Sequence, residues 1–277
     1  MPTACSSTAV VSVVHVYGFD LQCVEEGAGV PVLFSHGSGS DLRYWEPQRR
    51  PIGTRFRFVA FSRRFHGTGM WPAEGDYSTD AHVKDLLAIA QGLRAGPVHL
   101  VGFSTNIALR AALREPDLFR SLTIIEPNVP WLLEGTPEGE AVLASWREQN
   151  ARVRAEAGDD ELRRAALWFE LVNNRGRGTF AAQPEDLQRM WLDNFATKRP
   201  SPPAQDPLTC AELSAIRVPT LALGAEYGMQ YSRRILDRLA ACIPQSRLVI
   251  IDGATHFMSY QMPKTFNAVL LDFIAEH

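Results

Sequence analysis

The sequence lacks the features that mark several large classes of protein. Its 28 lysines and arginines are outnumbered by 31 aspartates and glutamates, which gives a net charge of −3 at pH 7. Proteins that bind nucleic acid by neutralising phosphates are normally basic, so we expect no nucleic-acid partner. No apolar run approaches the roughly 18 residues that cross a bilayer, so we expect no membrane partner either. The composition, 45% hydrophobic and 21% charged, is typical of a globular protein.

Cysteine is scarce and scattered. The four cysteines are Cys5, Cys23, Cys210 and Cys242, with no CxxC pair and no metal-ligand spacing. We therefore predict four reduced thiols in a cytoplasmic protein, with no disulfide bond and no metal site.

Basic residues are also missing from the start of the sequence, since none precedes Arg43. The apolar run 9–16 thus lacks the charged region of a signal peptide, and we predict a β-strand there.

Short apolar runs alternate with longer amphipathic segments along most of the chain. The predicted strands are the runs 30–35, 56–61, 97–103, 121–125, 219–223 and 247–251. The predicted helices include 79–93, 231–242 and 263–276, where apolar residues recur at helical spacing. This alternation predicts right-handed βαβ units and a mainly parallel, doubly wound sheet of the α/β class.

One region interrupts this alternation. Residues 128–208 show no convincing strand, are helical in character and rich in large aromatics, and end in a proline-rich segment. We predict a helical cap at 128–208, inserted between two strands of a core made of residues 1–127 and 209–277. Most of its aromatics are expected to pack the cap onto the core, whereas Trp131 and Trp168 are predicted to line a substrate pocket.

One serine stands where a buried strand meets a helix. The segment VHLVGFSTN carries Ser104 two residues after Gly102. In a sharp strand-to-helix turn the serine backbone is strained and its hydroxyl is exposed at the carboxyl end of the sheet. The N–H of Thr105 then points to where an oxyanion forms. Asn106 replaces the last glycine of the usual G-x-S-x-G pattern and is a predicted substrate contact; an N-capping serine is the structural alternative.

Two further loops follow predicted strands. The loop SHGSGSD presents backbone N–H groups at the same sheet edge, so we predict Ser38 as the second oxyanion donor and His36 as a substrate contact. Near the C-terminus, IIDGATHFM places His256 after the last strand, where it can face a nucleophile, with Phe257 as a substrate contact. Taken alone, a glycine-rich turn and a structural histidine are the alternatives.

Together these segments resemble the α/β-hydrolase fold superfamily. The similarity runs from about residue 10 to 275 and includes SHGSGS, FSRRFHG, GFSTN, SLTIIEP and DGATHFMSYQMPKTFNAVLLDFI. The resemblance implies Ser104 as nucleophile and His256 as its base, with no metal and no organic cofactor. A serine at this position argues against the epoxide hydrolase and haloalkane dehalogenase branches, which need an aspartate. One fold hosts many chemistries, so the resemblance does not define the reaction.

The resemblance leaves two positions for the acid of a triad. In most of the superfamily the acid follows the strand after the insertion, where this chain reads LGAEYGMQ. Gly228 stands where an aspartate is common, and Glu226 is nearby. The family's other location is the end of the strand before the insertion, where Glu126 stands in TIIEPNVP. We favour Glu126, with Glu226 as the alternative.

The predicted activity is hydrolysis of an ester, a lactone or a related carbonyl bond through a Ser-His-Glu triad and an acyl-enzyme. The aromatic cap suggests a covered apolar pocket and therefore a small apolar substrate. Two alternatives stay open: a lyase or cyclase on the same fold, and a small-molecule binding protein without turnover. The sequence leaves the oligomeric state undefined, with a homodimer among the options.

Overall fold

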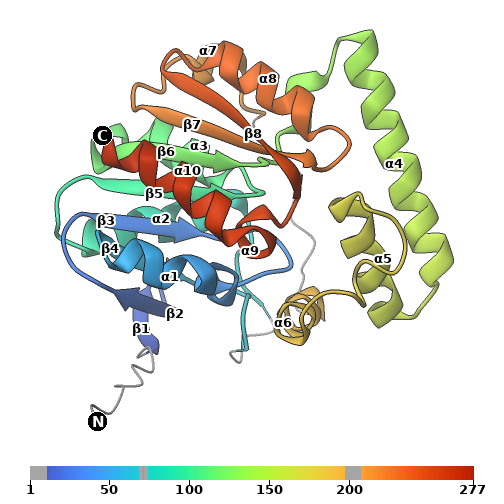
Figure 1. The fold of residues 1–277 in the computed structure, drawn as a ribbon, viewed down its shortest axis with the longest axis horizontal. Helices are drawn as coiled ribbons and strands as arrows, with labels where there is room; N and C mark the ends of the chain where they lie inside the picture. Colours follow the sequence, from blue (N-terminus) through green and yellow to red (C-terminus); the bar gives the residue numbers. More distant parts are fainter. Residues whose placement is uncertain (1–10, 69–70, 72–73, 197–206) are drawn as a thin grey trace.

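The computed structural model describes residues 11–68, 71, 74–196 and 207–277. Within them, eight strands form one sheet in the order β1-β2-β4-β3-β5-β6-β7-β8 (Figure 1). The strands are β1 (Val11–Val16), β2 (Phe19–Glu26), β3 (Pro31–Ser35), β4 (Arg57–Phe61), β5 (Val98–Phe103), β6 (Phe119–Ile125), β7 (Thr220–Tyr227) and β8 (Ser246–Thr255). The pairs β1–β2 and β2–β4 are antiparallel and the others are parallel, so the predicted mainly parallel sheet is confirmed.

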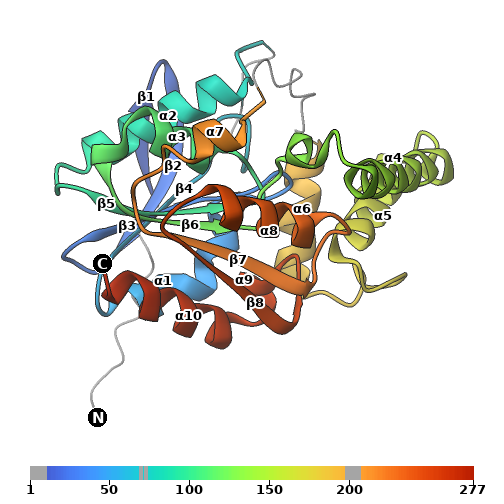
Figure 2. The same cartoon turned by 90° about the horizontal axis from the view of Figure 1, so that it is seen from above.

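Helices cover both faces of the sheet. One face carries α1 (Glu46–Gly53) and α10 (Pro263–Ala275), and the other carries α2 (Thr79–Gly92), α3 (Ile107–Arg114) and α8 (Ser232–Cys242) (Figure 2). Every residue of β3 and of β5 is buried, as expected for central parallel strands covered on both faces. The antiparallel strand β2 is the main element that the sequence patterns did not predict.

Between β6 and β7 the described chain is helical. The cap helices are α4 (Pro137–Ala157), α5 (Glu161–Asn173) and α6 (Glu185–Ala196), preceded by the 3₁₀ turn η3 (Pro130–Leu133). In both views they lie beyond the end of the sheet to which the parallel strands point (Figures 1 and 2). The described part of 128–208 contains no strand, and the proline-rich segment lies mostly outside the described residues.

Helix α6 is attached to the core loops by specific contacts. A Cβ atom on Gly39 would lie 2.5 Å from the ring of Trp191, so the loop and the indole pack closely. The amide of Asn194 accepts a hydrogen bond from the N–H of Gly67 (2.7 Å) and donates one to Asp41 Oδ2 (2.7 Å). The cap is therefore positioned over the loops that follow β3 and β4.

A disulfide bond joins Cys210, at the start of the short helix α7 (Cys210–Leu213), to Cys242 at the end of α8. The prediction of reduced thiols is wrong for this pair, because packing of α7 against α8 brings together residues that are 32 apart in the sequence. Disulfide bonds persist in oxidising compartments, so the cysteines of this chain do not support the predicted cytoplasmic location. Cys5 lies outside the described residues.

The third described cysteine is a free thiol. Cys23 is buried in β2, and burial raises its pKa to about 12. A thiol with such a pKa is almost entirely protonated at neutral pH and is a poor nucleophile. Cys23 is therefore a packing residue.

We expect the double substitution Cys210→Ser/Cys242→Ser to lower the free energy of unfolding by about 3 kcal/mol, because the bond closes a long loop in the unfolded chain. Denaturant unfolding with and without dithiothreitol measures this. The reductant should destabilise the wild type to the level of the double variant and leave that variant unchanged. Equal stability of the oxidised wild type and the variant would contradict the expectation.

Candidate active site

Ser104 lies directly after β5 in a strained turn. Its φ of +52° is unusual for a residue with a side chain. The N–H of Ser104 donates to the carbonyl of Ile125 at the end of β6 (2.8 Å), which fixes the turn. A Cβ atom on Gly102 would lie 2.4 Å from the Cβ of Ala108, so only glycine allows α3 to approach β5 this closely. This is the strand-to-helix elbow that the sequence predicted.

Asn106 occupies the N-cap position of α3 with φ −95° and ψ 2°. An L residue adopts this conformation readily, so the backbone does not require the glycine of the usual pattern. The side chain makes no capping hydrogen bond and Asn106 lines the cavity beside Ser104. Asn106 is thus placed where it can contact a substrate.

The loop after β3 lies against the serine. A Cβ atom on Gly37 would lie 3.0 Å from the Cβ of Ser104 and 3.1 Å from the ring of Phe103. Glycine at 37 therefore lets this loop approach the elbow. Ser38 and Thr105, the two predicted oxyanion donors, both line the cavity that contains Ser104.

The ring of His36 contacts the backbone of this loop and of the loop after β4. It is fully buried, its Nε2 accepts a hydrogen bond from the N–H of Arg63 (2.9 Å), and its Nδ1 lies 2.8 Å from the carbonyl of Gly37. Burial, with the positive charge of Arg63 as a second cause, holds the pKa of His36 well below its usual range. A neutral ring that accepts at Nε2 carries its proton at Nδ1, so both nitrogens are used by the backbone. The predicted substrate contact at His36 therefore does not fit this placement.

His256 follows β8 and is paired with Glu126. The Nδ1 atom of His256 lies 3.1 Å from Oε2 of Glu126, and both side chains are buried. The ring of Phe103, the residue before Ser104, lies 4.8 Å from the imidazole, so His256 is next to the elbow. Backbone N–H groups of Ala225 (3.1 Å) and Met229 (3.2 Å) donate to the two Glu126 oxygens and so hold the carboxyl group in place.

The carboxylate of Glu126 fills the place where the acid is more commonly found. A Cβ atom on Gly228 would lie 2.3 and 2.4 Å from its two oxygens, so residue 228 must lack a side chain while Glu126 is present. Glu226, the alternative acid, is exposed and accepts a hydrogen bond from the N–H of Gly253 (2.7 Å). The structure thus brings Glu126 to His256 and turns Glu226 elsewhere.

Two aromatic residues predicted to contact substrate have packing roles in the structure. Phe257 is buried and its ring stacks on Phe169 of α5 with centroids 4.5 Å apart. Trp168 packs edge-to-face on Trp146 within the cap, 5.7 Å between centroids. Trp131 lines the cavity as predicted, and its Nε1 donates to the carbonyl of Leu208 (3.1 Å).

The cavity beside Ser104 has a volume of about 220 Å³, and polar side chains dominate its lining. Besides the predicted residues it is lined by Arg63, Tyr77, Thr79, His82, Ile107 and Asn128. The prediction of an apolar pocket does not fit this lining, because most large aromatics of the cap pack against one another and against the core. These residues form no motif in the sequence, and the paired arginines after β4 in FSRRFHG are the one local signal of a polar wall.

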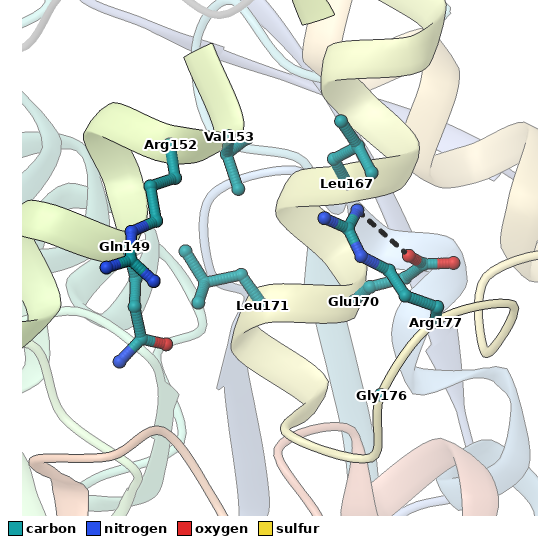
Figure 3. A pocket seen from close by; sticks show the side chains of 8 residues that line it. All are labelled: Gln149, Arg152, Val153, Leu167, Glu170, Leu171, Gly176 and Arg177. Carbon is teal, nitrogen blue, oxygen red and sulfur yellow. Dashed lines mark ion pairs between the residues drawn. The ribbon is translucent and has the colours of Figure 1, made fainter. Parts of the chain in front are cut away.

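A second cavity, also of about 220 Å³, lies between α4 and α5 in the cap (Figure 3). Arg177 and Glu170 both line this cavity, and the guanidinium of Arg177 lies 3.8 Å from the carboxylate of Glu170. No serine, cysteine or histidine is among the described residues that line it, so it offers no nucleophile or base of the kind found beside Ser104.

The sequence matches the alpha/beta hydrolase family over residues 32–269. The chain belongs to this family. It is 33% identical to a 2-(acetamidomethylene)succinate hydrolase of Mesorhizobium japonicum, with 90% of each chain covered. It is 26% identical to the putative carbamate hydrolase RutD of Azorhizobium caulinodans, covering 93% of this chain and 96% of that protein. These relatives support a hydrolase.

Solved structures show the same fold at low sequence identity. The carboxylesterase CesB of Bacillus subtilis superposes with a TM-score of 0.77 at 17% identity, covering 97% of this chain and 92% of that chain. The enol-lactonase of Burkholderia xenovorans LB400 superposes with a TM-score of 0.74 at 19% identity, covering 95% of this chain and 99% of that chain.

No helix in the described part of the chain is long and apolar enough to cross a membrane. No group of three or more His, Cys, Asp or Glu side chains among the described residues could hold a metal ion.

Proposed function

We propose that this protein hydrolyses an acyl bond of a small molecule through Ser104, His256 and Glu126. The observation that carries the proposal is the buried contact of 3.1 Å between His256 Nδ1 and Glu126 Oε2 beside the strained serine. A carboxylate at Nδ1 holds the imidazole in the tautomer whose Nε2 can accept a proton from a serine hydroxyl. The acyl bond is an ester, a lactone or a related bond, in keeping with relatives that act as hydrolases.

The reaction proceeds in two stages. Ser104 Oγ attacks the carbonyl carbon while His256 takes its proton, and the backbone N–H groups of Ser38 and Thr105 stabilise the oxyanion. His256 then protonates the leaving group, which departs and leaves an acyl-enzyme. Water, deprotonated by His256, attacks this ester and releases the acid with free Ser104. The carboxylate of Glu126 stabilises the imidazolium that forms on His256 during both stages.

A fluorophosphonate probe tests the nucleophile without knowledge of the substrate. We expect one covalent adduct, located at Ser104 by peptide mass spectrometry, and none in Ser104→Ala. His256→Ala should fold normally but react with the probe far more slowly, because its serine has no base. Absence of labelling in folded wild-type protein would contradict the proposal.

The lyase or cyclase alternative is separated from hydrolysis by turnover. The hydrolase proposal expects at least one ester or lactone in a broad panel to be cleaved by the wild type and not by Ser104→Ala. Labelling at Ser104 without turnover of any panel member would favour the non-hydrolytic alternative.

A further inference from the structure

Arg63 lies at the wall of the Ser104 cavity without an acidic partner. It is 3% exposed, and it forms no ion pair with any described residue. The next residue, Arg64, differs because it has an acidic partner. Two nitrogens of its guanidinium donate to the two carboxylate oxygens of Asp85, each at 2.6 Å. Arg64 is therefore neutralised within the fold and Arg63 is not. Burying an uncompensated charge is costly, so such a charge is most readily explained by an anionic ligand.

Other polar atoms at the same wall are also unpartnered. Among the described residues, Arg63 Nε, both ring nitrogens of His82 and Thr105 Oγ1 are buried without a hydrogen-bond partner. All three residues line the cavity that contains Ser104. Among the described residues, the Arg63 guanidinium has one hydrogen-bond contact with a side chain, in which a terminal nitrogen lies 3.3 Å from Nε2 of His66. Buried donors in native proteins normally have partners, so these atoms point to a ligand that supplies acceptors.

The electrostatics of this wall favour an anion. Burial lowers the pKa of Arg63, yet a guanidinium keeps its proton at neutral pH. Burial and then the charge of Arg63 hold the pKa of His82 well below its usual range, so His82 is neutral and offers one N–H. Among the described residues no acid forms an ion pair with Arg63, and the buried carboxylates of Asp85 and Glu126 are paired with Arg64 and His256. The wall therefore carries one uncompensated positive charge beside the nucleophile.

We propose that Arg63 binds a carboxylate of the substrate, so that the enzyme selects acyl compounds with an anionic group near the bond that Ser104 attacks. This inference rests on the proposed hydrolase function. The planar guanidinium suits a carboxylate, and the polar lining of the cavity suits a small, charged acid better than a lipid-like ester. His82 and Thr105 supply additional donors around the same group.

A matched pair of chromogenic esters tests the selection. Mono-p-nitrophenyl succinate carries a free carboxylate, and its methyl ester is the neutral control. The wild type should show a higher kcat/KM for the charged probe. Arg63→Met, which keeps the length of the side chain, should lose at least about 30-fold on the charged probe and change little on the neutral one. Arg63→Lys should recover part of the loss.

The kinetic outcomes are decisive for Arg63. An equal loss on both probes would assign Arg63 a purely structural role and overturn the inference. Equal kcat/KM values of the wild type on the two probes would do the same. A hydrolase failure looks different, because then neither probe is cleaved and Ser104 does not react with the fluorophosphonate.

A binding measurement covers that second case. Glutarate should bind the inactive Ser104→Ala protein in calorimetric titration, and the further substitution Arg63→Met should weaken this binding at least about 30-fold. Such binding without labelling of Ser104 would keep the carboxylate site and reject the hydrolase. Binding of inorganic phosphate with no binding of glutarate would overturn the choice of carboxylate.

Discussion

Glu126→Gln is expected to lower kcat by about 10³- to 10⁴-fold, with little change in KM. The amide is nearly isosteric, and its oxygen can still accept from the N–H of Ala225 or Met229. What it loses is the negative charge at His256 Nδ1, which both fixes the tautomer and stabilises the imidazolium in the transition state. The rate of fluorophosphonate labelling should fall in parallel, and this readout does not depend on the substrate.

Glu226→Gln is the matched control. Glu226 belongs to the neighbouring strand end and was the alternative acid, but its carboxylate is exposed and binds the N–H of Gly253. Its substitution should change kcat by less than about 3-fold, in line with small effects of surface changes. The reverse ranking of the two variants would show that Glu226 is the acid and that Glu126 only fills space beneath Gly228.

The sequence predicted the sheet well because buried strands have a distinct composition. The runs at β3 and β5 are mostly apolar, and β6 is buried at every residue except Arg120, as expected for parallel strands covered on both faces. β2 escaped prediction because its residues, FDLQCVEE, mix charged and apolar side chains near the edge of the sheet. Its pairing with β1 and β4 is a long-range property that local patterning does not reveal.

The site was predictable where a motif dictates backbone geometry. The elbow at Ser104 depends on Gly102 and on a positive φ, both of which are local. The cavity wall was not predictable, because Arg63, His82 and Thr105 come from separate parts of the chain and meet only in the fold. The aromatics of the cap suggested an apolar pocket, but composition cannot distinguish rings that face a cavity from rings that stack on each other, as Phe169 and Phe257 do.

Gly228→Ala should inactivate the enzyme about as strongly as Glu126→Gln. The new Cβ would stand within 2.3 Å of a Glu126 oxygen, so the carboxylate must leave its place against His256. The backbone at 228 does not have a positive φ, so an alanine is compatible with the local conformation and the protein should still fold. Thermal unfolding checks the fold, and kcat on a chromogenic ester checks the effect. An active Gly228→Ala would show that Glu126 is not held where the structure places it.

The double variant Glu126→Gly/Gly228→Asp should regain at least about 100-fold of the kcat that Glu126→Gly alone loses. An aspartate at 228 starts from a Cβ that lies 2.7 Å from the carboxyl carbon of Glu126, so its own carboxylate can occupy nearly the same volume. The N–H groups of Ala225 and Met229 remain there to bind it. Glycine at 126 also suits the φ of +44° that glutamate adopts there. A folded double variant as inactive as Glu126→Gly would mean that the acid must come from β6, because the end of β7 cannot direct a carboxylate at His256.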